Sequence, residues 1–406
     1  MSAATPAPRT AAFAFIFITV LLDMLALGMV IPVLPKLVEG FLSGDTARAA
    51  EIFGIFSTVW ALMQFVFSPV QGALSDRFGR RPVILMSNFG LGLDYVMMAL
   101  APTLAWLFVG RVISGITSAS ISTSYAYIVD VTPPEQRSRR FGMLGAAFGF
   151  GFVVGPGLGG FLAASDPRLP FWMAAAFSLL NGLYGLFVLP ESLAKERRSP
   201  LAWRRANPLG SLTLLRSHAG LARLAAANFL AYLAHVALPT VFVLYAGYRY
   251  GWQEREVGAT LTLVGVCAVF VQVALVGWFV SRFGDRGAMM IGLLFGAAGF
   301  AIYGAAPTGT LFLLGVPVMA MWGLTSPAVN ALMSRWVGPS EQGALQGANG
   351  SIQGLANMIG PAIFSLTFSF AIGFGRDLGL PGAPYFLGAA MLVASAAIGW
   401  QATRAG

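Results

Sequence analysis

Four ionisable side chains lie inside long apolar segments of the sequence. They are Asp23, Asp94, Arg111 and His235. An ionisable group in a membrane span costs at least ~2.5–3.5 kcal/mol on insertion scales, so each one requires a functional or structural reason. A carboxylate whose proton affinity differs between two conformations can load a proton on one side of a membrane and release it on the other. We therefore expect Asp23 and Asp94 to exchange protons or contact substrate, with Arg111 as the competing charge.

A structural role is the alternative for each of these residues. The two aspartates could hydrogen-bond a neighbouring helix, and the arginine could tie helices together. His235 could be hydrogen-bonded to a neighbour, although the unperturbed pKa of histidine, ~6.5, suits proton exchange. Gln64 and Gln272 are further polar candidates for the lining of a substrate cavity. We expect most other amides of the apolar segments to join helices.

The composition describes an integral membrane protein. Of 406 residues, 57% are hydrophobic and 10% are charged, whereas soluble domains carry about 25% charged residues. The net charge of +9 would also suit a nucleic-acid partner, but the basic residues form short clusters between apolar segments, as in cytoplasmic loops. We therefore expect a lipid bilayer and no nucleic acid as partner. The single cysteine, Cys267, cannot form an internal disulfide.

Twelve apolar segments are long enough to cross a bilayer, which takes about 20 residues in a helix. They cover residues 11–38, 51–74, 82–101, 104–130, 141–164, 170–189, 221–248, 255–280, 287–305, 309–333, 344–371 and 383–403. No small-residue cleavage site follows a short apolar core at the N-terminus, so the first segment is expected to be a spanning helix and not a signal peptide.

The basic residues between these segments predict the orientation. Eighteen lysines and arginines fall on one side of the spans and six on the other. The richer side is cytoplasmic by the positive-inside rule. Both termini are then cytoplasmic, as an even number of spans requires. The predicted domains are a first six-helix bundle over 1–189, a basic cytoplasmic linker over 190–220 and a second six-helix bundle over 221–406.

Short motifs of the first half recur in the second half. GALSDRFGRR at 72–81 returns as GWFVSRFGDR at 277–286, and GP at 155–156 returns at 360–361. VTPPEQ with VGPSEQ and GITS with GLTS keep the same order, and all four offsets lie between 205 and 208 residues. Two parallel halves are typical of transporters that rock one half against the other. The predicted fold class is an all-α integral membrane protein with twelve transmembrane helices in two pseudo-symmetric six-helix bundles.

The charged turn at 72–81 is a candidate cytoplasmic gate. Its two glycines permit a tight backbone passage. Asp76 could accept hydrogen bonds from a helix N-terminus or pair with an arginine of the loop at 131–140, beside which Asp130 is a further partner. The alternative is that the arginines only fix the topology. The candidate gate residues are Gly72, Asp76, Arg77, Gly79, Arg80, Arg81 and Asp130.

A glycine-rich segment in the fifth predicted span, FGFGFVVGPGLGG, resembles a phosphate-binding loop only superficially. It lacks the strand–loop–helix context and the Gly-Lys-Ser/Thr sequence of such loops. We expect its glycines to let the helix pack closely against a helix of the other half, with a bend at the proline. The residues of this motif are Gly151, Gly155, Pro156, Gly159 and Gly160.

These motifs are similar to those of the major facilitator superfamily over essentially the whole chain. GALSDRFGRR resembles its loop motif, and Arg111-xxx-Gly115-xxx-Ala119 resembles its buried-arginine motif linked to proton coupling. The glycine motif at 151–160 resembles that of the twelve-helix drug–proton antiporters, and among these the sequence is most similar to tetracycline efflux pumps, through SDRFGRRPVIL, LDYVMMALAP and GRVISGIT. Two features depart from those pumps. Residues 293–300 lack the acid of the ninth span, and His235 stands in the seventh span, where no histidine is expected.

The resemblance implies a proton-coupled efflux transporter of the inner membrane that exports tetracycline-like or other amphipathic drugs by alternating access. It places Asp23 and Asp94 at acidic positions that face the central cavity. It implies no cofactor beyond the proton gradient, with Mg²⁺ only as an ion chelated to the substrate, and we expect a monomer. The alternatives are an exporter or importer of a metabolite such as a sugar or siderophore, and, more remotely, an integral-membrane enzyme. Against the enzyme, the sequence shows no metal-ligand cluster, nucleophile–base pair or nucleotide loop.

Overall fold

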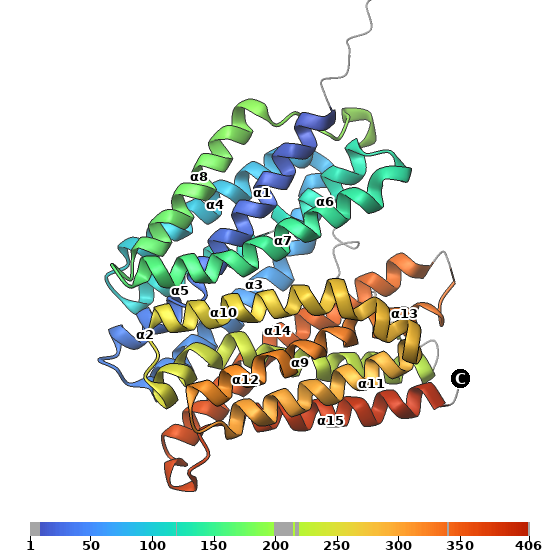
Figure 1. Cartoon of the computed structure of the whole chain (residues 1–406). Helices are drawn as coiled ribbons and strands as arrows, with labels where there is room; N and C mark the ends of the chain where they lie inside the picture. Colours follow the sequence, from blue (N-terminus) through green and yellow to red (C-terminus); the bar gives the residue numbers. More distant parts are fainter. Residues whose placement is uncertain (1–8, 119, 199–213, 216–218, 339–340, 405–406) are drawn as a thin grey trace, which may run out of the picture. The chain divides into compact units, whose positions relative to one another are not determined.

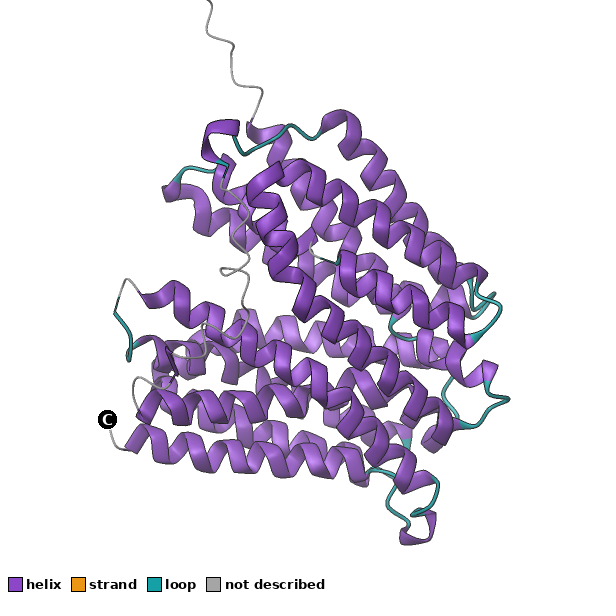
Figure 2. Ribbon diagram, turned by 180° about the vertical axis from the view of Figure 1, so that it is seen from behind, coloured by secondary structure: helices purple, strands orange, loops and turns teal. Residues whose placement is uncertain are grey.

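The structure is a computed structural model, which describes residues 9–118, 120–198, 214–215, 219–338 and 341–404. The regular structure of these ranges is helical, without strands (Figures 1 and 2), so the all-α prediction is confirmed there. Ala119 and most of the predicted linker, residues 199–213 and 216–218, lie outside the described residues.

The helices follow one another closely along the chain. They are α1 (Arg9–Val30), α2 (Leu34–Phe41), α3 (Thr46–Phe78), α4 (Arg80–Leu100), α5 (Leu104–Thr117), α6 (Ser120–Val131), α7 (Pro134–Ala163), α8 (Leu169–Val188), η1 (Lys195–Arg197), α9 (Ala219–Tyr250), α10 (Glu254–Phe270), η4 (Val271–Leu275), α11 (Val276–Ala305), α12 (Gly309–Ala320), η5 (Met321–Leu324), α13 (Thr325–Ser334), α14 (Gln342–Ile372), η7 (Arg376–Leu378) and α15 (Ala383–Arg404).

The chain forms two compact units. Unit 1 comprises Met1–Val33 and Leu62–Asn207, and unit 2 comprises Leu34–Ala61 and Pro208–Gly406. Helix α3 therefore contributes its first half to unit 2 and its second half to unit 1. The division into two six-helix bundles by chain order remains a prediction.

Each unit is built from helices that are distant in sequence. In unit 1, α1 packs on α7 and α8, and α4 packs on α5 and α8. In unit 2, α9 packs on α14 and α15, and α11 packs on α12 and α15. The core of unit 1 contains Phe15, Ile16, Tyr127 and Leu144, which have 0–1% of their surface exposed. Burial of such side chains positions the polar groups described below.

The predicted spans lie in helices apart from short breaks. Ten segments of the described chain are long and apolar enough to cross a membrane. One of them, Glu254–Ala305, has 52 residues, which as one helix would extend ~78 Å, far beyond a hydrocarbon core of ~30 Å. Its backbone leaves helical geometry at Gly284, with φ 68° and ψ 172°, so it supplies two spans. The shorter helices α5 and α6 together supply another.

Several spans are interrupted where the sequence predicted continuous helices. The first, expected over 11–38, is divided into α1 and α2 by a turn at 31–33. Pro32 causes this interruption, because it has no N–H group and disfavours helical backbone at the residue before it. In unit 2, η4 is a π-helix and η5 is a 3₁₀-helix, each within a predicted span.

Candidate functional site

A buried ion pair joins two helices of unit 1. Nη2 of Arg111 on α5 lies 3.5 Å from Oδ2 of Asp94 on α4 and 3.8 Å from Sδ of Met98. Asp94 is fully buried, and Arg111 is 9% exposed. Gly110 leaves room for the carboxylate, because a Cβ there would lie 2.6 Å from Oδ1 of Asp94. Removal of one member of such a pair leaves the other charge buried and uncompensated.

Asp23 adds a second carboxylate to this region. It lies on α1 and is 5% exposed. The phenol of Tyr95, next to Asp94 in sequence, lies within electrostatic range of Asp23, Asp94 and Arg111. Of the three ionisable groups predicted in the first half, Asp94 and Arg111 form a pair, and Asp23 lies in the same unit within range of Tyr95. Two carboxylates and one guanidinium carry a net charge of −1, and a single bound proton makes the set neutral.

The side chain of Gln64, on α3, does not contact the ion pair. It bonds instead to the break in the fourth predicted span, which lies between α5 and α6. Its Nε2 donates a hydrogen bond of 3.1 Å to Oγ of Ser118, which directly follows α5. Nε2 of Gln71 donates to the carbonyl oxygen of Ile116 in the last turn of α5. The last carbonyls of a helix have no donor within the helix, so the amide of Gln71 satisfies one of them and stabilises the helix end.

The glycine motif of α7 packs against α1. A Cβ on Gly155 would lie 2.8 Å from Cα of Gly28, and a Cβ on Gly28 would lie 3.0 Å from Cδ of Pro156. Gly151 and Gly159 also approach the backbone of α1. Small residues permit this backbone-to-backbone contact. Both helices belong to unit 1, so the prediction that these glycines meet a helix of the other half is wrong.

Glu191 organises the charged turn of unit 1, although no motif pointed to it. Gly79 separates α3 from α4 with φ 108° and ψ 163°, a region that only glycine adopts readily. The two carboxylate oxygens of Glu191 accept hydrogen bonds from the backbone N–H groups of Arg80, at 2.9 Å, and Arg81, at 3.3 Å. A carboxylate at this position complements the helix dipole. The helix N-terminus is thus capped by Glu191 and not by Asp76.

Arg80 is the centre of an ion network at this turn. Its Nη1 lies 2.5 Å from Oδ1 of Asp76, and its Nε lies 3.1 Å from Oδ2 of Asp130. Only 12% of its side chain is exposed. Among the described residues, both carboxylates therefore pair with Arg80 and not with an arginine of 131–140. Arg137 in that loop donates instead to backbone carbonyls at the end of α6.

The other members of the motif have separate roles. Gly72 lies inside α3, and a Cβ there would meet no described atom within 4 Å outside its own helical surroundings. The prediction that Gly72 permits a tight backbone passage is therefore wrong. The tight passage occurs at Gly79 alone of the two glycines. The guanidinium of Arg77 lies 5.3 Å from the ring centroid of Phe78. Nη2 of Arg81 donates a hydrogen bond of 2.5 Å to the carbonyl oxygen of Leu186.

The equivalent turn of unit 2 has a similar backbone and reversed charges. Gly284 has φ 68° and ψ 172°. Asp285 stands 205 residues after Arg80, and Arg335 stands 205 residues after Asp130. Asp285 and Arg335 form an ion pair. The repeat therefore preserves the pairing of two positions while exchanging their signs.

The two candidates predicted in the second half lie in unit 2. His235 on α9 is exposed, and its ring centroid lies 5.4 Å from that of Trp322. Gln272 is exposed within η4, and its Oε1 lies 3.9 Å from the position of a Cβ on Gly323. Sequence reasoning did not single out Trp322, and its only signal was an aromatic residue beside a glycine inside a span.

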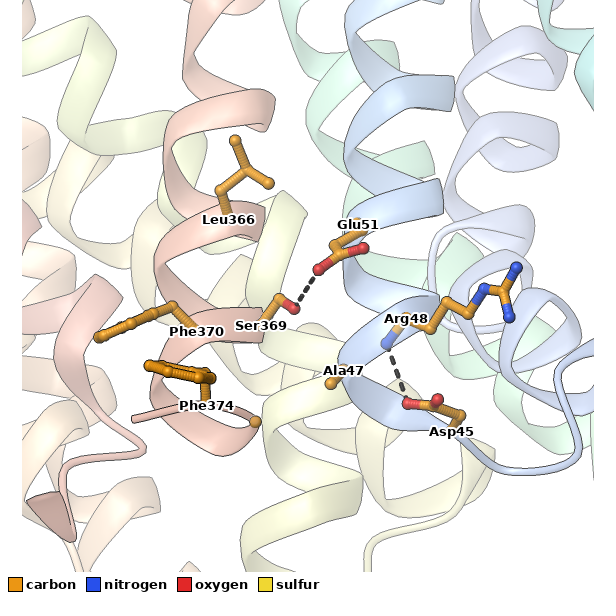
Figure 3. A pocket seen from close by; sticks show the side chains of 9 residues that line it. Asp45, Ala47, Arg48, Glu51, Leu366, Ser369, Phe370 and Phe374 are labelled. Atoms are coloured by element: carbon orange, nitrogen blue, oxygen red, sulfur yellow. Dashed lines mark hydrogen bonds between the residues drawn. The ribbon is translucent and has the colours of Figure 1, made fainter. Parts of the chain in front are cut away.

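A surface hollow of about 550 Å³ in unit 2 is lined mainly by residues of α3 and α14. Like the contacts of Glu191, the bond between these two helices was not indicated by any motif. Figure 3 shows Glu51 of α3 directed toward Ser369 of α14, whose Oγ donates a hydrogen bond of 2.7 Å to Oε1. Arg48 points away from that bond in the same view. One turn along α3, a Cβ on Gly54 would lie 2.6 Å from Cβ of Ser365. These contacts hold the first half of α3 against α14.

Comparison with known proteins assigns the chain to a family. The family model described as Major Facilitator Superfamily matches residues 16–361 and 224–404. The chain belongs to this superfamily. It is 36% identical to "Tetracycline resistance protein, class C" of Escherichia coli over 86% of this chain and 88% of that protein. It is 29% identical to "Multidrug resistance protein 2" of Bacillus subtilis over 89% of both.

Solved structures agree with this assignment at the level of the fold. A bacterial homologue of the human lysosomal transporter Spinster superposes with a TM-score of 0.79 at 16% identity, over 99% of this chain and 98% of that one. The superfamily and fold predicted from the motifs are therefore confirmed. The chain is a multi-pass membrane transporter of the major facilitator superfamily and not an enzyme.

Proposed function

We propose that this superfamily member exports tetracycline-like or other amphipathic drugs across the cytoplasmic membrane in exchange for protons. The names of the similar proteins, tetracycline resistance and multidrug resistance proteins, support a drug as substrate. The exchange of protons is supported by one observation, the buried pair of Asp94 and Arg111. Asp23 lies within electrostatic range of Tyr95, the residue next to Asp94.

The charge balance of these three residues suggests how protons and drug compete. With both carboxylates ionised, the net charge of −1 attracts a cationic group, and buried charges interact strongly because screening is weak. Protonation of one carboxylate removes that attraction and weakens the hold on Arg111. The proton and the cationic drug therefore exclude each other, which is the requirement for antiport. Alternating access then carries each of them in one direction.

The setting of this transport is also part of the proposal. The chain acts as a monomer in the lipid bilayer with both termini in the cytoplasm, as the distribution of arginines favours. The proton gradient supplies the energy, and no cofactor is required. A divalent ion such as Mg²⁺ would cross only as a chelate of the drug. No group of three potential metal ligands occurs among the described residues.

Proton release from inverted membrane vesicles tests this proposal. The vesicle lumen is acidified and monitored with a pH-sensitive dye, and tetracycline with Mg²⁺ or other cationic drugs are then added. We expect the dye signal to recover with drug, and recovery to fall at least tenfold in Asp94→Asn and Asp23→Asn. Asp377→Asn, in an exposed loop turn, is the matched control and retains recovery.

The outcomes separate the parts of the proposal. Recovery with other drugs and not with tetracycline would show that the substrate is a different drug, while the antiport mechanism would still hold. Recovery that persists in both aspartate variants would overturn the assigned proton site. No recovery with any drug would reject drug efflux and favour a metabolite such as a sugar or siderophore as substrate.

A further inference from the structure

Unit 2 contains two departures from α-helical geometry that lie against each other. The π-helix η4 (Val271–Leu275) and the 3₁₀-helix η5 (Met321–Leu324) are in contact. Such segments inside helices are frequent at functional sites, because they redirect side chains and free backbone groups. In membrane transporters, interrupted helices commonly form the substrate site. The two segments therefore mark a candidate ligand-binding region in unit 2.

Trp322 of η5 is held rigidly at this place. Its ring centroid lies 5.7 Å from that of Phe300, which is fully buried. Phe300 in turn stacks on the buried ring of Tyr385 at 6.1 Å. A Cβ on Gly296 would lie 2.8 Å from Cγ of Trp322, so the indole occupies a close slot beside α11. A ring fixed in advance loses little conformational entropy when a ligand packs on it.

Two polar side chains lie close to η5, one beside the indole of Trp322 and one beside Gly323. The imidazole of His235 lies at 5.4 Å from it, with the two ring planes inclined at 54°. Gln272 and Gly323 are both exposed, and Oε1 of Gln272 approaches Gly323. An ionisable side chain in a span almost always faces the protein interior or a water-filled cavity rather than lipid. His235 and Gln272 are thus placed to offer hydrogen bonds to a solute.

The charge at this place differs from that of the ion pair in unit 1. On α11 the carboxylate of Asp285 pairs with Arg335, and the described parts of α9, η4, η5, α13 and α14 contain no aspartate or glutamate. A ligand cation therefore finds no carboxylate counter-charge on these helices. An aromatic face flanked by an imidazole and an amide instead suits a flat ring with hydrogen-bonding groups on its edge.

We propose that Trp322, His235 and Gln272 form a subsite of unit 2 that binds a planar conjugated ring bearing carbonyl or hydroxyl groups on its edge. The ring stacks on the indole of Trp322, and its edge forms hydrogen bonds with the imidazole of His235 and the amide of Gln272. Trp322 thereby selects planar drugs over flexible ones. This subsite rests on the proposed function, because it assigns one part of the drug to unit 2.

Transport by the purified full chain in proteoliposomes tests the subsite. The probes are tetracycline with Mg²⁺, the planar cation ethidium and the flexible cation dodecyltrimethylammonium. We expect Trp322→Leu to raise KM for the two planar probes about tenfold with kcat little changed, and Trp322→Phe to raise it less than threefold, since a stacking surface remains. KM for dodecyltrimethylammonium stays unchanged. Trp278→Leu, which removes an exposed tryptophan outside the cluster, is the matched control.

A binding measurement separates this subsite from the proposed function. Quenching of tryptophan fluorescence by tetracycline with Mg²⁺ is followed in detergent, and we expect the saturable component to disappear in Trp322→Phe and to weaken in His235→Leu and Gln272→Leu. Wild-type binding without transport of any probe would reject drug efflux and leave the subsite standing. Unchanged KM and quenching in Trp322→Leu would overturn the subsite. An equal rise of KM for all three probes would also overturn it, since it would show a general structural defect.

Discussion

Gly155 of unit 1 and Gly360 of unit 2 occupy equivalent positions of the repeat, each before a proline, but they meet different neighbours. A Cβ on Gly155 would lie 2.8 Å from Cα of Gly28 and 2.9 Å from the carbonyl oxygen of Leu25. A Cβ on Gly360 would lie 2.7 Å from Cγ1 of Val236. A backbone can yield only by moving a whole helix, whereas a side chain can be shortened. Gly155 is therefore required by the packing of two helix backbones. Gly360 is required only by the side chain of Val236.

The charged turns show a second contrast of this kind. In unit 1, the side chains of Arg80 and Asp130 are only 12% and 19% exposed, and Arg80 also pairs with the more exposed carboxylate of Asp76. In unit 2, the pair of Asp285 and Arg335 has reversed signs, and 66% of the arginine side chain is exposed. Partly buried, multiply bonded pairs stabilise a structure more than exposed ones. The repeat thus preserves geometry, while the energetic importance of each copy depends on its surroundings.

The largest effect should come from the two glycine positions. Gly155→Ala forces α1 and α7 apart and should destabilise the protein by about 1–3 kcal/mol, as overpacking does. Gly360→Ala should be milder, and the second substitution Val236→Ala should restore most of its stability, with Val236→Ala alone as control. Thermal unfolding in detergent measures both. Equal losses at the two glycines, with no rescue, would remove the contrast between backbone and side-chain neighbours.

The glycines of the two turns should come next. Gly79→Ala and Gly284→Ala both place an L-residue in backbone geometry that costs of order 1–3 kcal/mol. Gly79→Ala should cost more, because its Cβ also displaces the carboxylate of Glu191 from the start of α4. Gly72→Ala, at an open position inside a helix, is the control and should be neutral or stabilising by up to about 1 kcal/mol. The midpoint of thermal unfolding gives this order, and a harmful Gly72→Ala would contradict it.

The smallest effect should distinguish the two ion pairs. Asp285→Asn should change stability by less than about 1 kcal/mol, because its partner Arg335 is exposed to solvent. Asp130→Asn leaves Arg80 with one carboxylate fewer and should slow transport about tenfold. Exchange of charges sharpens the test. Asp285→Arg with Arg335→Asp should retain transport. Arg80→Asp with Asp130→Arg should not, because the new aspartate faces Asp76. Equal tolerance of both exchanges would show that the surrounding network has no influence.

The sequence determined the spans, the repeat and the positions of the two turns. Each is a local signal: apolar runs of bilayer length, motifs at a constant offset, and glycines between charged residues. The sequence also located Asp23, Asp94 and Arg111, because a charge in an apolar run is conspicuous on its own. It suggested His235 and Gln272 because a polar side chain in an apolar run is noticeable in the same way.

The tertiary structure alone decided which groups meet. Glu191 caps a helix that begins 111 residues earlier, Trp322 lies against His235, and Glu51 bonds to a serine 318 residues away. The glycines of α7 met α1 and not the helix expected from the other half. Helix periodicity specifies which residues share a face, but the partner of that face depends on how all the helices pack together, and no spacing in the chain records that choice.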